Sequence, residues 1–361
     1  MTLTVAVIGA GYWGPKLVRN FEASEDWDLV AVCDRDEERA RRVAGNRPGV
    51  EVHTSVESLL ARDDLDAVAV ATPASTHARL AIAALEAGKH VLVEKPLADD
   101  VADAAAMVRT ARERDLVLMA DHTYCYTPAV QRIGEIIAEG TLGEVLFVDS
   151  VRINLGLVQP DVDVLWDLAP HDLSIFDYVL PGGLNPVAVS AHGADPLGAG
   201  RACIGYLTMP LPGGAIAHVH VNWLSPTKIR QMVIAGTRRT LVWDDLNPQQ
   251  RVSIYDRGVD LASQSAAGLD RTSATVSYRL GDMHAPALPE REALSAMVEE
   301  FAAAVGEHRQ PRTPGDSGLR VLTVLDAARR SLAAYGATIP TPSLPPSPDA
   351  TGSSRHLAGV R

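Results

Sequence analysis

The most constraining feature of this sequence is a glycine-rich segment near its beginning, Gly9-Ala10-Gly11-Tyr12-Trp13-Gly14. It follows an apolar run, 5–8, that predicts a strand, and it precedes a run from Pro15 that predicts a helix. The first glycine permits a tight turn, the second lets a pyrophosphate approach the backbone, and the third lets helix and strand pack closely. The segment therefore predicts the phosphate-binding turn of a dinucleotide-binding domain, with the pyrophosphate on the helix N-terminus.

An acidic residue at the expected distance supports this prediction. Asp34 stands 20 residues past Gly14, at the end of the second predicted strand. A carboxylate at that place accepts hydrogen bonds from the ribose hydroxyls and repels the 2′-phosphate of NADP. Arg35 follows at once and could tolerate that phosphate. The sequence therefore favours NAD, with NADP the less favoured cofactor.

The first third of the chain alternates short, Val-rich strands with helices, which is typical of a doubly wound parallel sheet in an α/β protein. The predicted strands are 5–8, 29–32, 50–53, 67–70, 90–93 and 116–119. The predicted helices are 15–23, 37–44, 56–61, 76–87 and 99–114. This part, residues 1–123, is the predicted Rossmann domain.

From residue 124 the pattern changes to that of an α+β domain with a large, mostly antiparallel open sheet. A helix at 128–139, a long strand at 144–155 and a helix at 171–180 precede six strands separated by hairpin-like turns. Two closing helices are predicted at 288–307 and 317–335. The predicted boundaries are 124–339 for this domain and 340–361 for a disordered tail rich in Pro, Ser and Gly. The stretch 263–285 has no clear period.

Composition narrows the class of protein. The 33 basic and 45 acidic residues give a net charge of −12, which argues against a nucleic-acid binder. Cys33, Cys125 and Cys203 form no CxxC pair, so neither a disulfide scaffold nor a zinc site is expected. His218 and His220 alternate on a strand without a third ligand, so no metal is predicted. No apolar run reaches the roughly 18 residues of a membrane helix. We expect a reduced, cytoplasmic, globular protein.

A second motif, Glu94-Lys95-Pro96, directly follows the fifth predicted strand. Ligands of open α/β sheets bind outside the carboxyl ends of the strands. A lysine there can donate a hydrogen bond to a substrate oxygen, and a cis bond before Pro96 would fix the turn. The alternative is an ordinary solvated lysine at a strand end.

A third motif combines a carboxylate and an imidazole, since Asp167 and His171 are four residues apart in Trp166-Asp167-Leu168-Ala169-Pro170-His171-Asp172. Because proline is tolerated in the first turn of a helix, we expect His171 near a helix start and Asp167 just before it. Histidine is the usual proton carrier near neutral pH. The alternative is a helix-capping Asp and a buried, satisfied His.

Two weaker clusters accompany these motifs. Thr72, Pro73 and His77 follow the fourth predicted strand and should lie along the same crevice, although Thr76 in that segment could equally be only a helix cap. Arg152 and Asn154 share one face of the long strand. They could bind a polar or anionic substrate, or only face solvent.

Together the order of these motifs resembles the glucose-fructose oxidoreductase / inositol dehydrogenase (Gfo/Idh/MocA) family, as does the closing segment SGLRVLTVLDAARRS. The resemblance extends to about Ala337. It implies a Rossmann domain followed by a domain whose open sheet packs against other subunits, giving a homodimer or homotetramer. It also implies oxidation or reduction of a hydroxyl-bearing carbon, mostly of a sugar, with NAD(P).

The resemblance also assigns roles to residues. It implies that Lys95 lies beside the reacting oxygen, that His171 carries the proton and that Asp167 orients this catalytic pair. The implied cofactor contacts are Gly9, Gly11, Tyr12, Trp13, Gly14, Asp34, Arg35, Thr72, Pro73, His77, Glu94, Lys95 and Pro96. The implied substrate contacts are Tyr126, Arg152, Asn154, Trp166, Asp167 and His171.

One segment departs from the family pattern. Where many members have Arg–aromatic–x–Pro, this chain has Cys125-Tyr126-Thr127-Pro128. Together with RINLG and LWDLAPHDLS, this form resembles the branch that acts on nucleotide-linked or secondary-metabolite sugars, which includes C3 dehydrogenases and ketoreductases.

The sequence thus predicts an NAD-dependent dehydrogenase that oxidises a secondary hydroxyl, C3 in that branch, of a sugar, nucleotide-sugar or aminoglycoside-type sugar. The alternatives are an NAD(P)H-dependent ketoreductase, a redox-neutral glycosidase or isomerase that recycles NAD, and a non-catalytic NAD sensor. The presence of Lys95, Asp167 and His171 argues against the sensor.

Overall fold

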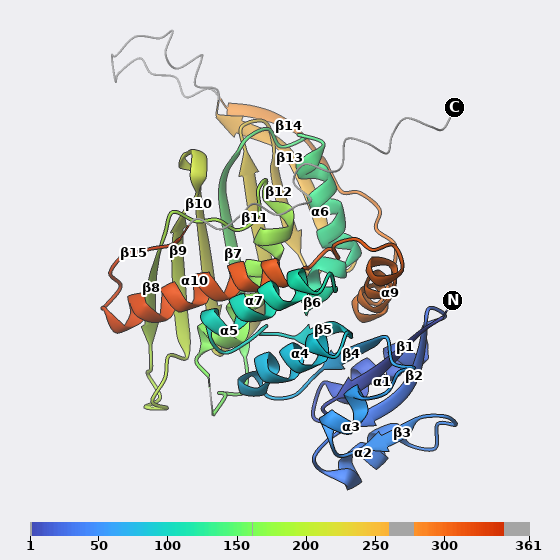
Figure 1. Cartoon of the computed structure of the whole chain (residues 1–361). Coiled ribbons are helices and arrows are strands. Elements are labelled where there is room, and N and C mark those ends of the chain that lie inside the picture. Colours follow the sequence, from blue (N-terminus) through green and yellow to red (C-terminus); the bar gives the residue numbers. More distant parts are fainter. Residues whose placement is uncertain (1, 161, 260–277, 343–361) are drawn as a thin grey trace, which may run out of the picture.

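The computed structural model describes residues 2–160, 162–259 and 278–342. Within these residues a six-stranded sheet has the order β3-β2-β1-β4-β5-β6 (Figure 1). All its strand pairs are parallel, which confirms the predicted doubly wound sheet. The strands are β1 Leu3–Ile8, β2 Trp27–Cys33, β3 Glu51–His53, β4 Ala67–Val70, β5 His90–Glu94 and β6 Leu118–Asp121.

Helices cover both faces of this sheet because successive apolar side chains point to opposite sides of each strand. Ala6 and Ile8 of β1 belong to one buried cluster, and Val5 and Val7 belong to another. The helical segments of this part are α1 Gly14–Glu22, α2 Glu37–Ala44, α3 Val56–Leu60, η1 Ala74–Thr76, α4 His77–Glu86 and α5 Val101–Glu113.

The second sheet has nine strands among the described residues, in the order β14-β13-β12-β11-β7-β10-β9-β8-β15. Its neighbours are antiparallel except for the central pair, β7 and β10, which is parallel. The strands are β7 Val145–Leu155, β8 Ala188–Ala194, β9 Ile204–Pro210, β10 Ile216–Asn222, β11 Leu224–Gly236, β12 Thr240–Asp244, β13 Val252–Val259, β14 Tyr278–His284 and β15 Ile339–Pro340. The large, mostly antiparallel sheet is therefore confirmed.

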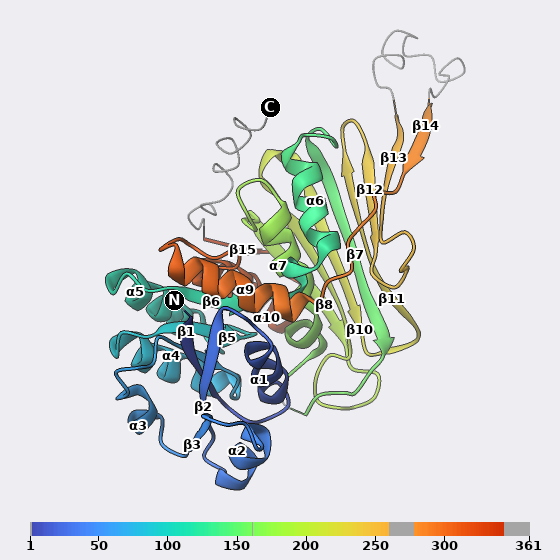
Figure 2. The same cartoon turned by 90° about the vertical axis from the view of Figure 1, so that its right-hand side faces the viewer.

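Helices lie on one face of this second sheet. Figure 2 shows α6 and α7 beside it, and no helix of the described chain on the opposite face. The remaining helical segments are η2 Thr123–Tyr126, α6 Pro128–Ala138, α7 Val164–Val179, η3 Pro212–Gly214, α9 Ala293–Gly306 and α10 Gly315–Ala333. No helix of the described residues is both long enough and apolar enough to cross a bilayer.

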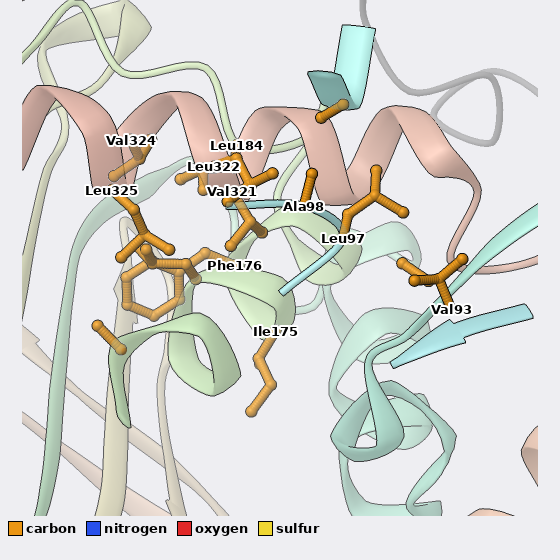
Figure 3. Close-up of a cluster of buried hydrophobic side chains, with 14 of the residues drawn as sticks. Val93, Leu97, Ala98, Ile175, Phe176, Leu184, Val321, Leu322, Val324 and Leu325 are labelled. Carbon is orange, nitrogen blue, oxygen red and sulfur yellow. The ribbon is translucent and has the colours of Figure 1, made fainter. Parts of the chain in front are cut away.

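Helix α10 joins the two parts of the molecule. Figure 3 shows Leu97 and Ala98, which follow β5, packed with Phe176 of α7 and Val321 of α10 in one apolar cluster. The packing is close, because a side chain at Gly318 would place its Cβ 2.8 Å from a Leu97 methyl group. The segment that follows β5, which carries Lys95, is therefore held against α7, which carries His171.

Residues late in the chain also complete the first domain. Trp27 of β2 stacks on Phe301 of α9 with 5.1 Å between ring centroids, and its indole N–H donates to the Val298 carbonyl (2.9 Å). The N–H of Ala120 in β6 donates to the Thr313 carbonyl (2.9 Å). The edge strand of the first sheet is therefore paired by the segment between α9 and α10.

The prediction for the helix around His171 was wrong about where it begins. α7 begins at Val164, because the Asp163 carboxylate caps it by accepting from the N–H groups of Leu165 (2.9 Å) and Trp166 (3.0 Å). Pro170 lies inside this helix rather than at its start. Asp167 and His171 therefore lie one turn apart on the same helix.

The structure places part of a stretch that the sequence left unassigned, and it changes one terminal prediction. β14 falls within the unplaced stretch 263–285, whose residues 263–277 lie outside the described residues. Pro340 belongs to the two-residue strand β15, which pairs with β8, rather than to a tail. The predicted disorder of residues 343–361 lies outside the described residues.

Candidate active site

The glycine-rich turn between β1 and α1 has the shape that a pyrophosphate requires. Gly9 has φ +105°, and a Cβ there would lie 2.6 Å from the Ala71 carbonyl oxygen. A Cβ at Gly14 would lie 2.1 Å from the Gly9 carbonyl oxygen. A Cβ at Gly11 would meet nothing within 4 Å. The first and third glycines therefore serve packing, whereas the second leaves an open approach to the backbone, which fits NAD.

Two aromatic residues of this turn, Tyr12 and Trp13, lie close to the Lys16 side chain. The Lys16 ammonium lies 3.8 Å from the Trp13 ring centroid and 4.0 Å from that of Tyr12. Tyr12 is 79% exposed, and Trp13 is half-buried at the start of α1. Both remain proposed cofactor contacts.

Asp34 is held in one orientation by the backbone. Its Oδ2 accepts from the N–H of Ala10 (2.7 Å), and its Oδ1 accepts from the N–H of Asp36 (2.9 Å). Each carboxylate oxygen can accept a further hydrogen bond. The side chain is therefore placed beside the glycine-rich turn with capacity left for ribose hydroxyls. Arg35 is exposed next to it.

Replacing Asp34 by asparagine should weaken NAD binding about 10- to 100-fold, since hydrogen bonds to a charged group are lost. The same change removes the repulsion of a 2′-phosphate, so the preference for NAD over NADP should shrink. Dissociation constants for both cofactors, measured by tryptophan fluorescence, test this. Asp28→Asn, at an exposed position on β2, the strand that Asp34 follows, is the control; an unchanged NAD/NADP ratio in Asp34→Asn would contradict the role of Asp34.

A buried histidine ties together the two loops of the cofactor crevice. His77 Nε2 lies 2.7 Å from the Thr72 carbonyl oxygen, and Nδ1 lies 2.9 Å from that of Pro96. The Lys95–Pro96 peptide bond is cis, as the sequence motif suggested. Burial lowers the pKa of His77. The structure therefore places His77 as a link between two loops, while Pro73 is exposed beside it.

Lys95, which follows β5, meets the first turns of α7. Its Nζ donates to the Asp167 carbonyl oxygen (3.3 Å) and lies 3.7 Å from Asp167 Oδ1. The other carboxylate oxygen, Oδ2, accepts from the indole N–H of Trp223 (3.1 Å). The Asp167 side chain is therefore fixed between Lys95 and Trp223. The two sequence motifs, 72 residues apart, meet at one place.

His171 lies one turn further along α7 and contacts Tyr124, with 5.1 Å between ring centroids. Burial lowers its pKa well below the ordinary 6.5, and the positive charges of Lys95 and Arg152 lower it further. The imidazole is therefore neutral at physiological pH. A neutral imidazole beside an ammonium group can accept a proton from a hydroxyl that the ammonium polarises.

Arg152 is not free to bind a substrate in the way that the sequence analysis allowed. It is buried, and its guanidinium forms a double hydrogen bond with Asp172 of α7 (Nε–Oδ2 2.8 Å, Nη2–Oδ1 3.0 Å). Its cation also lies 4.6 Å from the centroid of the Tyr124 ring. Arg152 therefore ties β7 to the helix that carries His171.

Asp172→Asn should lower the free energy of unfolding by about 3–5 kcal/mol, because it leaves the buried Arg152 charge without its partner. Urea denaturation followed by circular dichroism measures the change. The double variant Arg152→Met/Asp172→Leu should regain most of the loss. A single variant as stable as the wild type would show that this pair does not secure α7.

The other predicted substrate contacts, Tyr126, Asn154 and Trp166, differ in their surroundings. Tyr126 is fully buried, and its hydroxyl is 2.7 Å from Thr313 Oγ1, so it packs in the core rather than facing the site. Asn154 lies next to Gly156, where a Cβ would be 2.8 Å from its amide nitrogen and 3.2 Å from the Trp223 ring. Trp166 is half-buried on the first turn of α7. Asn154 and Trp166 remain proposed substrate contacts.

The sequence analysis missed two aromatic residues of the site. Trp223, directly after β10, and Tyr124, in η2, each contact a member of the Asp/His pair. Neither belongs to a motif. A tryptophan that closes a strand and a tyrosine that follows β6 become informative only when the sheet order is known.

Comparison with known proteins agrees with this geometry. Residues 3–122 match a family described as an oxidoreductase family with an NAD-binding Rossmann fold, and residues 130–242 match the GFO/IDH/MocA C-terminal domain. UDP-N-acetylglucosamine 3-dehydrogenase of Acidithiobacillus ferrooxidans is 31% identical over 92% of this chain and 98% of its own length. Inositol 2-dehydrogenase of Rhizobium meliloti is 27% identical over the same shares.

Solved structures have the same fold. The Acidithiobacillus ferrooxidans enzyme superposes with a TM-score of 0.78 at 29% identity, over 93% of this chain and all of that one. GenD2 from gentamicin A biosynthesis, in complex with NAD, superposes with a TM-score of 0.75 at 28% identity, over 95% of this chain and 97% of that one.

Proposed function

Because the chain belongs to the GFO/IDH/MocA family of NAD-binding oxidoreductases, we propose that it oxidises a secondary hydroxyl, at C3, of a nucleotide-linked or aminoglycoside-type sugar. The coarser assignment, a sugar oxidoreductase that uses NAD, follows from family membership. The observation that carries the proposal is the meeting of Lys95, Asp167 and His171 beside the cofactor crevice.

In the proposed mechanism the chain supplies the proton chemistry, and NAD, when bound, accepts the hydride. The Lys95 Nζ donates a hydrogen bond to the sugar oxygen and stabilises the developing alkoxide. The neutral imidazole of His171 takes the hydroxyl proton. Asp167, fixed by the Trp223 indole, holds the Lys95 ammonium in place.

The substrate class is proposed from two relatives. One acts on UDP-N-acetylglucosamine at C3, and the other belongs to gentamicin A biosynthesis. Both are similar to this chain over more than nine tenths of its length. The oxidative direction is favoured by Asp34, since a carboxylate beside the ribose selects NAD rather than NADP.

A substrate panel tests this proposal. Purified protein with NAD is incubated with UDP-linked sugars, free sugars, inositol and aminoglycosides, and NADH is followed by absorbance. NADH growth with UDP-linked or aminoglycoside sugars alone is the expected result. Oxidation of NADPH by a keto-sugar, without the forward reaction, would instead support the ketoreductase. Tightly bound NAD without any net NADH would favour internal recycling or a sensor.

We also propose that a second copy of the chain covers the helix-free face of the nine-stranded sheet. That face carries the half-buried Val151 and Ile153 of β7 and the 49% exposed Tyr206 of β9. Light scattering is expected to give a multiple of the 38.4 kDa chain mass. Val151→Arg, which places a charge at the centre of that face, should reduce the measured mass to that of one chain. An unchanged mass would place the interface elsewhere.

A further inference from the structure

Two carboxyl groups lie side by side directly behind Lys95. Glu94 ends β5 and Asp121 ends β6, and the two residues are partners in the register of these parallel strands. Glu94 is 5% exposed and Asp121 is 2% exposed. The backbone therefore brings two buried acids together at the carboxyl edge of the sheet, where ligands of this fold bind.

Two of the four oxygens of this pair have no hydrogen-bond donor among the described residues. Glu94 Oε2 accepts from the N–H of Lys95 (3.2 Å), and Asp121 Oδ1 accepts from the hydroxyl of Thr123 (2.5 Å). The other two oxygens, Glu94 Oε1 and Asp121 Oδ2, receive no N–H or O–H from the described residues. These two oxygens belong to carboxyl groups whose residues are paired in the register of adjacent strands. Since carboxylates only accept hydrogen bonds, a proton retained by one acid would supply a donor that these oxygens lack.

The surroundings provide little positive charge for a second anion. Lys95 acts on both acids, but it is also paired with Asp167. His122, next to Asp121, is buried, and burial lowers its pKa to about 4, so it is neutral. Arg320 of α10 is already paired with Asp177 of α7, since its Nη2 lies 2.8 Å from Asp177 Oδ2.

The directions of the pKa shifts of Glu94 and Asp121 agree with one shared proton. Burial raises the pKa of Glu94 and of Asp121, and the charge of Asp121 raises that of Glu94 further. Two adjacent carboxyl groups in a buried place titrate as a unit, and the first proton is held far above the ordinary range. Both effects favour the retention of one proton by the pair.

We propose that Glu94 and Asp121 share one proton and act as a single fixed negative charge that favours the oxidised over the reduced form of NAD. With Lys95 positive, Asp167 negative and His171 neutral, the shared charge leaves this end of the crevice with one net negative charge. The nicotinamide ring is a cation in NAD⁺ and neutral in NADH, so that charge stabilises NAD⁺ selectively. The inference requires only NAD binding and not the identity of the sugar.

Replacing the two acids with amides of the same shape tests the effect of their charge separately from that of their shape. Glu94→Gln and Asp121→Asn each replace the shared proton with an amide N–H, and the remaining carboxylate keeps the single charge. The double variant Glu94→Gln/Asp121→Asn keeps the shape and loses the charge. The two single variants are therefore matched controls for the double one.

Infrared spectroscopy of the protein without substrate tests the shared proton. Wild type at pH 8 should show the carbonyl stretching band of one protonated carboxyl group that both single variants lack. Identical spectra in that region would overturn the proposal, because both acids would then be ionised. This measurement needs neither the double variant nor any activity, so it stands if the double variant fails to fold or if the proposed substrate is wrong.

Calorimetric titration with NAD⁺ and with NADH tests the consequence. The preference for NAD⁺ should fall about tenfold or more in the double variant at low salt and remain near the wild-type value in both single variants. A preference retained by the double variant, or lost equally in a single variant, would overturn the electrostatic role. Neither outcome depends on which sugar is oxidised.

Discussion

Lys95→Met is expected to lower kcat by about 10²- to 10⁴-fold while NAD binding is retained. Methionine keeps the apolar stem but removes the ammonium that donates to the Asp167 carbonyl and, in the proposed mechanism, to the sugar oxygen. The loss should appear in kcat more than in KM, because the stabilised charge develops only as the hydroxyl proton leaves.

A lysine at the other end of β5 provides the control for this experiment. Lys89 precedes the other end of β5, where its ammonium donates to the Arg62 carbonyl (2.8 Å). Lys89→Met removes a comparable buried charge far from the site, and its kcat should stay near that of wild type. Steady-state rates with the substrate identified in the panel, together with NAD titrations, measure both effects. Turnover close to wild type in Lys95→Met would remove Lys95 from the mechanism.

His171→Asn should cost about 10²- to 10⁴-fold in kcat/KM, because the proton acceptor is lost while a polar side chain of similar reach remains. The pH dependence of wild-type activity provides a second test of His171. A base works only when it is unprotonated, and burial and the neighbouring cations lower the pKa of His171 well below 6.5. Activity should therefore persist below pH 6.5 and fall only at more acidic pH.

The asparagine substitution has a matched control in His308, which is exposed and has a positive φ of +52° that asparagine tolerates. His308→Asn should leave both rate and profile unchanged. A wild-type acid limb centred at or above 6.5, or an active His171→Asn with an unshifted profile, would assign the proton transfer to another group. The profile is taken as kcat/KM, which reports the free enzyme.

The sequence was sufficient for the features that depend on local pattern. Gly9, Gly14 and Asp34 have their predicted positions because a tight turn and a strand end leave few alternatives. The position of Lys95 was expected from strand order at the carboxyl edge of the parallel sheet, whereas its meeting with Asp167 was implied only by the family resemblance.

Features that depend on a distant partner could not be predicted. The period of the strand placed Arg152 and Asn154 on one face, but it could not show that this face is buried or that Asp172 would neutralise Arg152 there. The start of α7 was missed because Pro170 satisfies the rule for a helix beginning, whereas the Asp163 cap fixes the true one. The pairing of Glu94 with Asp121 needs the register of two strands that lie 27 residues apart in sequence.

The late residues that pack on the early sheet have a consequence for biosynthesis. Strand β6 is complete by Asp121, yet the backbone that pairs its outer edge is at Thr313, and the ring that covers Trp27 is that of Phe301. A growing chain emerges at roughly 5–20 residues per second. For about 10 to 40 s the nascent first sheet therefore has an open edge and an uncovered apolar face, which is the interval in which chaperones are most needed.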